Sequence, residues 1–544
     1  MKNTSKKAQL DQPRFSFPFW TAFFGIVLFY FVTHLWRLDS FPVFADESIY
    51  IRWAQLFLDD WKQYLFFALN DGKTPLFIWA LAAAQSWSSD QLIAGRLLSV
   101  AGGFVQLLAT WLILREFTHK KATQLLGMLL ISLLPFWFTY HRFAMMDGWL
   151  TAFLSLAFWA ALIVVKSKGV RQWSMVILSG SFFGLALWTK LPALFFLPIY
   201  LIIPFFGERI DAAKPLHFSS LNGVKKLKIF TPYIISGLIG LSLFGLLRLA
   251  PGFGQLFHRG QDFSFTVSEV VNGKWTETLP NSMRFFEFFG AYLTWPLLLL
   301  IAAGLFSNRQ RKSTALLLLC SLIFISPFIL LGKVVYPRYL LPAAIFLTIA
   351  AVLSLESLAL RCTKAVRDGN FLWAVVGLFV SLLAGQAFSQ ASYFMAAFVF
   401  TPDVTPFVKV DRQQYLEEWS SGHGIVQTVK LIESLTTQHS VAVATEGRFG
   451  TLPDALLLYF HGKDVHNLYI EGTGQYPVKN IPDFFTMRAK AFDQSLLVVN
   501  SHRMELRLPA DKLVAEYCRP NTAPCLQVWD VTNLVKAEPS TQSP

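Results

Sequence analysis

The chain has 544 residues, of which 54% are hydrophobic and only 15% are charged, and its mean hydropathy is +0.45. This composition excludes an ordinary soluble globular protein and predicts a membrane protein. The net charge of +13 would suggest a nucleic-acid partner in a soluble protein, but here the Lys and Arg residues cluster in short connections between apolar runs. We therefore expect no polynucleotide partner.

Apolar runs long enough to cross a bilayer recur along most of the chain. A spanning helix needs about 20 apolar residues, and residues 17–36 supply that length without a charged side chain. This run is too long for the core of a secretion signal and no small-residue cleavage site follows it, so we expect it to remain as an anchor. The runs predict about eleven spans in all. They lie near residues 17–36, 92–115, 122–140, 147–166, 172–190, 191–206, 229–249, 287–306, 313–331, 338–358 and 371–398.

The connections between these spans alternate in charge. Basic clusters such as KSKGVR and NRQRK occupy every second connection, and the positive-inside rule assigns them to the cytoplasm together with residues 1–16. The loops 37–91 and 250–286 fall on the opposite side, and the first of them is rich in Asp. We therefore expect a multi-pass protein of the cell membrane, with a cytoplasmic amino terminus and a transmembrane domain over residues 17–399.

The composition changes near residue 400 to that of a soluble domain. Segments typical of strands, SVAVAT and SLLVV, are interleaved with helical segments such as GIVQTVKLIESL. Residues 400–536 therefore predict a small extracytoplasmic α/β domain, followed by a disordered tail over 537–544. Cys518 and Cys525 are the expected disulfide, because the other two cysteines lie in or beside apolar spans. The predicted fold class is a mainly α-helical polytopic membrane protein with a small C-terminal α/β domain.

Ionisable residues gather at the external ends of the predicted spans. Such residues are costly at membrane depth and usually serve a function. The set contains Asp46, Glu47, Lys73, Arg142, Asp147, Lys190 and Arg338, with Tyr339 beside the last. Carboxylates and cations at one headgroup boundary suit a substrate with a hydroxyl to deprotonate and a phosphate to hold.

Structural interpretations of the same residues stay open. Asp46 and Glu47 fit a solvated pair or a helix cap. Lys190 and Arg338 are placed to extend towards lipid phosphates, and the Arg and Asp of the segment HRFAMMDGWL could pair with each other. The functional interpretation depends on all of these groups meeting on one side of the membrane.

The order of five segments resembles that of the GT-C-fold membrane glycosyltransferases, in particular the protein mannosyltransferase and aminoarabinose transferase group. The segments are ADESIYIRWAQ, DGKTPLFIWALAAA, HRFAMMDGWLTAFL, TKLPALFFLP and YPRYLLPA. The resemblance covers about the first 400 residues, and it implies a GT-C fold and a polyprenyl-phosphate sugar donor.

The resemblance also implies roles for individual residues. Asp46 and Glu47 match the acidic motif of the first loop, in which the Asp is the base on the acceptor hydroxyl. Asp147 and Arg142 match the second acidic and basic element. Lys73 matches a Lys that precedes Pro, although this chain reads KTP where many relatives read KPP.

The remaining basic positions are implied to face the lipid phosphate. Lys190 and Arg338 match these positions, and Tyr339 lies beside them. Arg is suited to this role because its planar fork binds two phosphate oxygens at once. The predicted donor-phosphate-binding residues are thus Lys73, Arg142, Lys190, Arg338 and Tyr339, and the predicted catalytic residues are Asp46, Glu47 and Asp147.

The sequence thus predicts an enzyme that transfers a hexose such as mannose, or a related sugar, from a polyprenyl phosphate to a hydroxyl of a protein, lipid or glycan. A direct displacement would invert the anomeric carbon, whereas a retaining route would need a carboxylate nucleophile near the sugar. No nucleotide is required, and Mg²⁺ or Mn²⁺ could bind between Asp46 and Asp147. The alternatives are a flippase for a lipid-linked sugar and an assembly scaffold.

Overall fold

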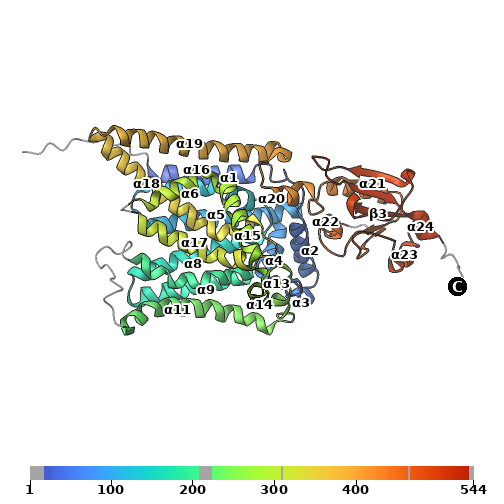
Figure 1. The fold of residues 1–544 in the computed structure, drawn as a ribbon. Coiled ribbons are helices and arrows are strands. Elements are labelled where there is room, and N and C mark those ends of the chain that lie inside the picture. Colours follow the sequence, from blue (N-terminus) through green and yellow to red (C-terminus); the bar gives the residue numbers. More distant parts are fainter. Residues whose placement is uncertain (1–17, 208–222, 308–309, 464–465, 538–544) are drawn as a thin grey trace, which may run out of the picture.

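The computed structural model describes residues 18–207, 223–307, 310–463 and 466–537. Figure 1 shows a body of long, roughly aligned helices, with a smaller domain containing a sheet at its C-terminal end. The predicted cytoplasmic segment 1–16 and all but the first residue of the predicted disordered tail, 537–544, lie outside the described residues.

The helical body is built from helices of very different lengths. The longer ones are α1 (Phe19–Leu35), α2 (Ala45–Asp59), α4 (Leu76–Ala84), α5 (Gln91–Phe117), α6 (Lys121–Leu133), α7 (Pro135–Tyr140), α8 (Met146–Lys166), α9 (Gly169–Thr189), α11 (Gly223–Gly245), α15 (Thr278–Phe289), α16 (Trp295–Leu305), α17 (Arg311–Leu331), α18 (Leu341–Arg367) and α19 (Phe371–Phe400). The short ones in the two long loops are α3 (Trp61–Tyr64), α12 (Gln255–His258), α13 (Gly260–Phe263) and α14 (Val267–Val271).

Seven helical segments of the described chain are long and apolar enough to cross a membrane. They are Gln91–Phe117, Met146–Lys166, Leu227–Leu249, Trp275–Leu305, Arg311–Leu331, Pro337–Arg367 and Phe371–Phe400. Shorter apolar helices, among them α1 and α6, lie beside them. The predicted polytopic helical membrane protein is confirmed, and the total of about eleven spans stays a prediction.

The predicted span 191–206 has a different backbone from its neighbours. It forms two 3₁₀ helices, η3 (Leu191–Leu201) and η4 (Ile203–Phe206). Prolines 192, 198 and 204 lack the N–H that an α-helix needs for its backbone ladder, which accounts for the tighter winding.

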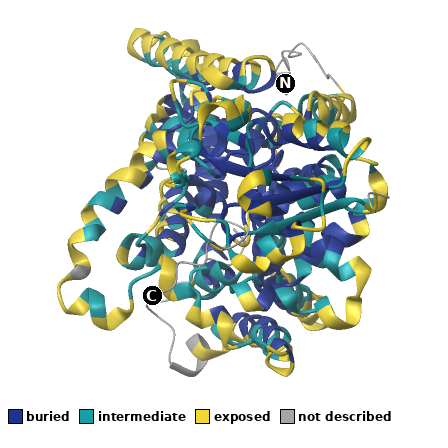
Figure 2. Cartoon of the chain, turned by 90° about the vertical axis from the view of Figure 1, so that its right-hand side faces the viewer, coloured by how far each residue is buried: buried dark blue, intermediate teal, exposed yellow. Residues whose placement is uncertain are grey.

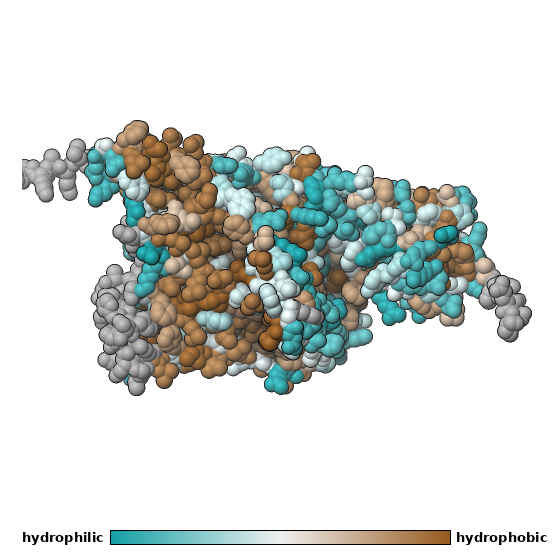
Figure 3. All heavy atoms as spheres, in the orientation of Figure 1, coloured by the Kyte–Doolittle hydropathy of each residue, from teal (hydrophilic) through white to brown (hydrophobic). Residues whose placement is uncertain are grey.

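Side-chain polarity separates the two parts of the molecule. Figure 3 shows hydrophobic residues covering the helical body away from the C-terminal domain, and hydrophilic residues covering that domain and the adjacent end of the body. A large apolar outer surface marks contact with a membrane or a partner, and the helices long enough to span a bilayer favour the membrane. The body is therefore the membrane part and the C-terminal domain is the water-exposed part.

The C-terminal domain contains a mixed sheet of five strands in the order β2-β1-β3-β5-β4. The strands are β1 (Val441–Thr445), β2 (Leu468–Gly472), β3 (Gln494–Asn500), β4 (Leu513–Tyr517) and β5 (Leu526–Asp530). β1 is parallel to both β2 and β3, with Val443 opposite Ile470 and Leu496, whereas β5 runs antiparallel to β3 and β4. All five residues of β1 are buried, as expected for a central strand covered on both faces.

Helices cover both faces of the sheet. They are α21 (Ile425–Thr436), α22 (Thr451–Phe460), α23 (Asp483–Ala489) and α24 (Thr532–Lys536). The short helix α20 (Lys409–Arg412) precedes the sheet, and its Asp411 accepts a hydrogen bond from Tyr292 of the helical body over 2.6 Å. Residues of α21 and α22 share one apolar core with α2 and α4, and residues of α23 and α24 form a second core on the other face. The predicted small α/β domain is confirmed, and so is the disulfide between Cys518 and Cys525.

The C-terminal domain packs directly on α2. The Ser48 hydroxyl donates to the Gly450 carbonyl over 3.1 Å, and the Gln55 amide donates to the Leu458 carbonyl over 3.1 Å. Figure 2, viewed from this domain, shows buried residues continuing behind the sheet into the helical body. The domain is thereby fixed against the helix whose first turn carries the predicted acidic pair.

Candidate functional site

An ion pair joins the first turn of α2 to the start of α18. The Nη2 atom of Arg338, in the 3₁₀ turn η9 (Pro337–Leu340), lies 3.0 Å from Oδ2 of Asp46. The Nη1 atom of the same guanidinium donates to Oε1 of Gln414 over 2.8 Å. Asp46 is 30% exposed whereas Arg338 is 8% exposed, so the carboxylate is the partner that a solute can reach.

Aromatic rings surround the Arg338 guanidinium. Its carbon atom lies 4.7 Å from the centre of the Tyr336 ring, 5.3 Å from that of Phe44 and 5.7 Å from that of Tyr339. Ring faces attract a cation electrostatically and keep water away from it. The guanidinium is therefore held in one orientation near the carboxylate.

A second ion pair also contacts Tyr339. Lys190, which follows the end of α9, places Nζ 2.7 Å from Oδ1 of Asp147 in the first turn of α8. The same ammonium group lies 4.9 Å from the centre of the Tyr339 ring. Asp147 is favoured at this position because the amino end of a helix carries partial positive charge. Tyr339 thus contacts the cations of both ion pairs.

Two further groups belong to this cluster. The charges of Lys73 and Arg338 both act on Lys190, and the Lys73 ammonium also lies 5.3 Å from the centre of the Phe263 ring. Tyr50, buried in α2, interacts electrostatically with Asp46 and Asp147. Six of the eight predicted residues therefore meet in one place: Asp46, Lys73, Asp147, Lys190, Arg338 and Tyr339.

Glu47 points away from this cluster into the helical body. Its carboxylate accepts from Arg96 Nε over 2.9 Å and Nη2 over 2.8 Å, and from the backbone N–H groups of Phe44 and Ala144 over 2.9 and 2.7 Å. Glu47 is fully buried and Arg96 is 1% exposed. The bond from the Phe44 N–H is half of a capping box, so the helix-cap interpretation applies to Glu47.

Arg142 binds the end of α1. Its guanidinium donates to the carbonyls of Thr33, His34, Trp36 and Arg37 over 2.7–3.0 Å. The last carbonyls of a helix have no partners within it, and an Arg that binds them closes the helix. Arg142 is buried and does not pair with Asp147, whose partner is Lys190.

Sequence reasoning missed several residues that shape the site. Gln414 lies in the segment before the soluble domain, where no pattern marks it as a partner of Arg338. Arg96 did carry a signal, because it is a charged residue inside a predicted span, and such residues usually have a buried partner. Tyr336 lies within the segment YPRYLLPA, of which only Arg338 and Tyr339 are among the predicted site residues.

The described residues contain one group of three side chains close enough to share a metal ion, namely Glu516, Cys518 and Cys525. The two cysteines form the disulfide and so offer no thiolates. Asp46 and Asp147 each contact a different cation. A divalent metal between these two carboxylates stays a prediction.

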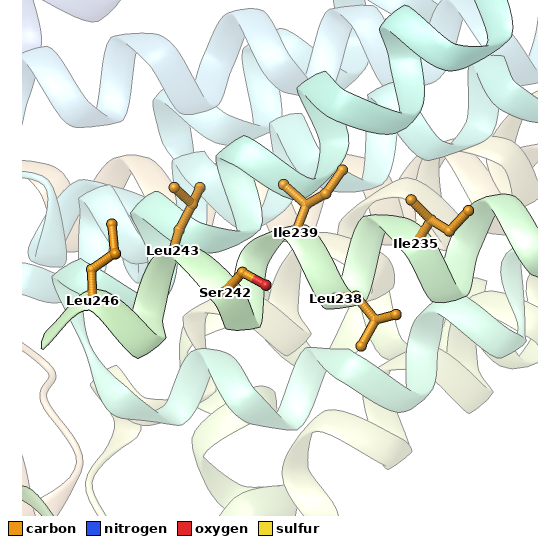
Figure 4. Close-up of a pocket in the computed structure, with 6 residues that line it drawn as sticks. All are labelled: Ile235, Leu238, Ile239, Ser242, Leu243 and Leu246. Atoms are coloured by element: carbon orange, nitrogen blue, oxygen red, sulfur yellow. The ribbon is translucent and has the colours of Figure 1, made fainter. Parts of the chain in front are cut away.

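An apolar hollow lies on α11 and the adjoining 3₁₀ helix η6 (Leu246–Leu249) in the membrane body. Its volume is about 390 Å³, and it is lined by Ile235, Leu238, Ile239, Ser242, Leu243 and Leu246 (Figure 4). This lining has no ionisable group, so it suits a hydrocarbon chain and not a reacting group.

Known proteins share both the sequence pattern and the fold. Residues 72–243 match the family model described as dolichyl-phosphate-mannose-protein mannosyltransferase. The structure of ArnT from Cupriavidus metallidurans in the apo state is similar over 96% of this chain and 99% of that one, with a TM-score of 0.54 and 14% identity. No curated protein sequence matches the chain.

Two liganded structures are also similar. ArnT from Cupriavidus metallidurans bound to undecaprenyl phosphate matches over 93% of this chain and 97% of that one, with a TM-score of 0.50 and 13% identity. Archaeal oligosaccharyltransferase AglB from Archaeoglobus fulgidus, in complex with an inhibitory peptide and a dolichol-phosphate, matches over 89% of this chain and 69% of that one, with a TM-score of 0.51 and 10% identity.

These similarities show the fold: the chain has the fold of ArnT and AglB, which is the GT-C fold predicted from the sequence. The resemblance to the protein mannosyltransferase and aminoarabinose transferase group, predicted from the order of its segments, is supported over residues 72–243 by the family match, and the similarity to ArnT over nearly the whole chain shows the same fold.

Proposed function

We propose that the chain transfers a sugar from a polyprenyl-phosphate donor to a hydroxyl acceptor on the extracytoplasmic face of the cell membrane, with its amino terminus in the cytoplasm. The observation that supports this most is the Asp46–Arg338 pair, which places a proton acceptor and a phosphate-binding cation 3.0 Å apart. The structural similarity to a protein bound to undecaprenyl phosphate supports the donor class. The sugar is a hexose such as mannose, or a related sugar.

Asp46 is the base in this proposal. The acceptor oxygen attacks the anomeric carbon while its proton passes to the Asp46 carboxylate, and the bond between that carbon and the phosphate oxygen breaks. The electron pair of the broken bond leaves with the polyprenyl phosphate. A single displacement of this kind inverts the anomeric carbon, and a positioned base contributes roughly 10²–10⁴-fold to such a rate.

Arg338 and Lys190 hold the departing phosphate. Both cations are already oriented, Arg338 by aromatic rings and Gln414, and Lys190 by Asp147, so little reorganisation is needed when negative charge develops on the phosphate. Lys73 adds a third positive charge at the same place. Donor phosphate bound at Arg338 competes with Asp46 for the guanidinium, which releases the carboxylate to accept the proton.

The other predicted site residues have positioning roles in this proposal. Glu47 fixes α2 through its ion pair with Arg96, and Arg142 fixes the end of α1 by binding its carbonyls. Asp147 is 4% exposed, and its role is to hold Lys190. The reaction uses no nucleotide, and transfer measured with and without EDTA tests whether Mg²⁺ or Mn²⁺ takes part.

The test is sugar transfer by full-length protein in proteoliposomes, with a radiolabelled polyprenyl-phosphate hexose and a mixed membrane extract as acceptor. We expect Asp46→Asn to reduce transfer by about two orders of magnitude or more while donor binding is retained. Asp39→Asn is the matched control, because Asp39 is an exposed residue of the same loop. Near-normal transfer by Asp46→Asn would overturn the assignment, and donor movement across the bilayer without transfer would identify a flippase.

A further inference from the structure

A second hollow lies in the C-terminal domain, apart from the two ion pairs. Its volume is about 390 Å³, and Arg448, Glu471, Gly472 and Phe484 line it. Pockets of a few hundred Å³ with a small number of polar groups are typical of ligand sites.

The topology of the sheet explains where this hollow forms. Arg448 follows β1, and Glu471 and Gly472 end the neighbouring parallel strand β2. From β1 the chain passes to α22, which joins the core on one face of the sheet, and from β2 it passes to α23, in the core on the other face. The hollow therefore lies at the carboxyl ends of two adjacent parallel strands, the edge of an open α/β sheet at which ligands usually bind.

Glycines bring the two strand ends close together. A Cβ atom on Gly472 would lie 2.2 Å from the Gly447 carbonyl oxygen, so only glycine fits there. Gly474 has a φ of +74° and its N–H donates to the same carbonyl over 2.8 Å. The floor of the hollow is therefore rigid before any ligand binds.

Two groups of opposite charge line the hollow. Oε2 of Glu471 is buried and accepts no hydrogen bond from the described residues, and its ion-pair partner is Arg488, whose Nη1 atom lies 3.6 Å away. The exposed guanidinium of Arg448 forms no ion pair with the described residues. An acceptor and a multiple donor facing one hollow suit a ligand rich in hydroxyl groups.

Exposed aromatic rings border the same end of the sheet. Phe449 is 58% exposed and Tyr476 is 70% exposed. The Arg503 guanidinium lies 4.1 Å from the centre of the Trp419 ring and 5.5 Å from that of Tyr476. Aromatic faces beside hydrogen-bonding groups match a sugar ring, which has one apolar C–H face and a rim of hydroxyls.

The segment that contains Arg448 is hydrogen-bonded to the first turn of α2. Gly450 follows Arg448 by two residues, and its carbonyl accepts from the hydroxyl of Ser48, which follows Asp46 by two residues. The reach of these short segments limits the distance from Arg448 to Asp46 to about 20 Å. An extended molecule of several linked sugars is long enough to span it.

We propose that the hollow beside Arg448 and Glu471 binds a sugar unit of the acceptor, so that the acceptor is a glycan whose reacting hydroxyl lies at Asp46. This inference rests on the proposed function and extends it to the class of acceptor. The C-terminal domain selects the acceptor, and the membrane body binds the donor.

The test is binding of full-length, detergent-solubilised protein to a printed array of oligosaccharides, with a peptide array in parallel. We expect wild type to bind one class of oligosaccharide, and Glu471→Gln and Arg448→Ala each to lose at least tenfold in binding. Glu505→Gln is the matched control, because Glu505 is an exposed carboxylate of the same domain. Absence of glycan binding, binding to peptides alone, or unchanged binding by both variants overturns the inference.

Transfer assays separate this inference from the proposed function. With the glycan found on the array as acceptor, we expect Glu471→Gln to raise the acceptor KM at least tenfold with kcat changed by less than twofold. If the glycan binds but no sugar is transferred to it by wild type, the proposed function fails and the binding site stands. If Asp46-dependent transfer occurs but no glycan binds, the proposed function stands and the glycan-binding inference fails.

Discussion

The buried pair of Glu47 and Arg96 makes the sharpest prediction, because Glu47 is adjacent to the proposed base in the sequence. Arg96→Met removes two hydrogen bonds from the Glu47 carboxylate, of 2.9 and 2.8 Å, and leaves it only the two backbone N–H groups. It also leaves the carbonyls of Leu38, Phe41 and Pro42 without their donor. Removing one partner of a buried pair costs about 3–5 kcal/mol.

Thermal unfolding of the full-length protein in detergent measures this cost. We expect Arg96→Met and Glu47→Gln each to lower the unfolding temperature strongly, because each leaves one buried charge without its partner. The double variant Glu47→Leu with Arg96→Met is expected to recover part of the loss, because it removes both charges together. If Glu47→Gln keeps the wild-type unfolding temperature but loses transfer by about 10² or more, then Glu47 acts on the substrate and the positioning role is wrong.

Three further changes test other parts of the structure. Lys190→Met should raise the donor KM at least tenfold in a donor titration, because it removes a cation from the phosphate position; an unchanged KM would contradict this. Burial raises the pKa of the Asp454 carboxyl from 3.8 to about 6, so the folded state binds more protons between these values and the free energy of unfolding falls as pH rises from about 4 to 6. The fall is at most about 3 kcal/mol, and Asp454→Asn should abolish it in unfolding curves at several pH values. Reduction of the Cys518–Cys525 disulfide, which closes a loop with a sequence separation of 7, should cost the C-terminal domain about 2–3 kcal/mol in unfolding measurements.

The part of the site that could be predicted was the gathering of charges at one boundary. Asp46 and Arg338 are separated by 292 positions and still form a pair. Alternation of the spans is enough to place both at span ends on the same side, because each crossing of the bilayer reverses the side on which a helix ends. The topology of the spans therefore predicts which charged residues lie at the same membrane boundary and can contact one another.

The individual role of each charged residue could not be predicted in the same way. Successive residues of a helix point about 100° apart, so Asp46 and Glu47 face different surroundings although they are neighbours. Asp46 forms an ion pair with Arg338 and is partly exposed, whereas Glu47 forms a buried ion pair with Arg96. The direction in which each side chain points depends on how α2 packs against the rest of the protein. The sequence around residues 46 and 47 does not show this packing.

The sheet was predictable at its centre and less so at its edge. β1 and β3 are continuous apolar segments because both faces of a central strand are covered. β2 and β4 contain no fully buried residue. Half-buried edge strands of five residues resemble loops in composition, so their pairing depends on the strands beside them.

Helix α2 connects the two proposed sites, because it carries Asp46 and also binds the C-terminal domain. Its first turn carries Asp46 towards Arg338, and its other residues pack on α22 and bind Gly450 and Leu458 of the C-terminal domain. Ser48, which makes the bond to Gly450, is fully buried, so this contact is shielded from water and resists local opening. A glycan held beside Arg448 is therefore held relative to the base itself, and the C-terminal domain selects the acceptor without having to move towards the membrane when the acceptor binds.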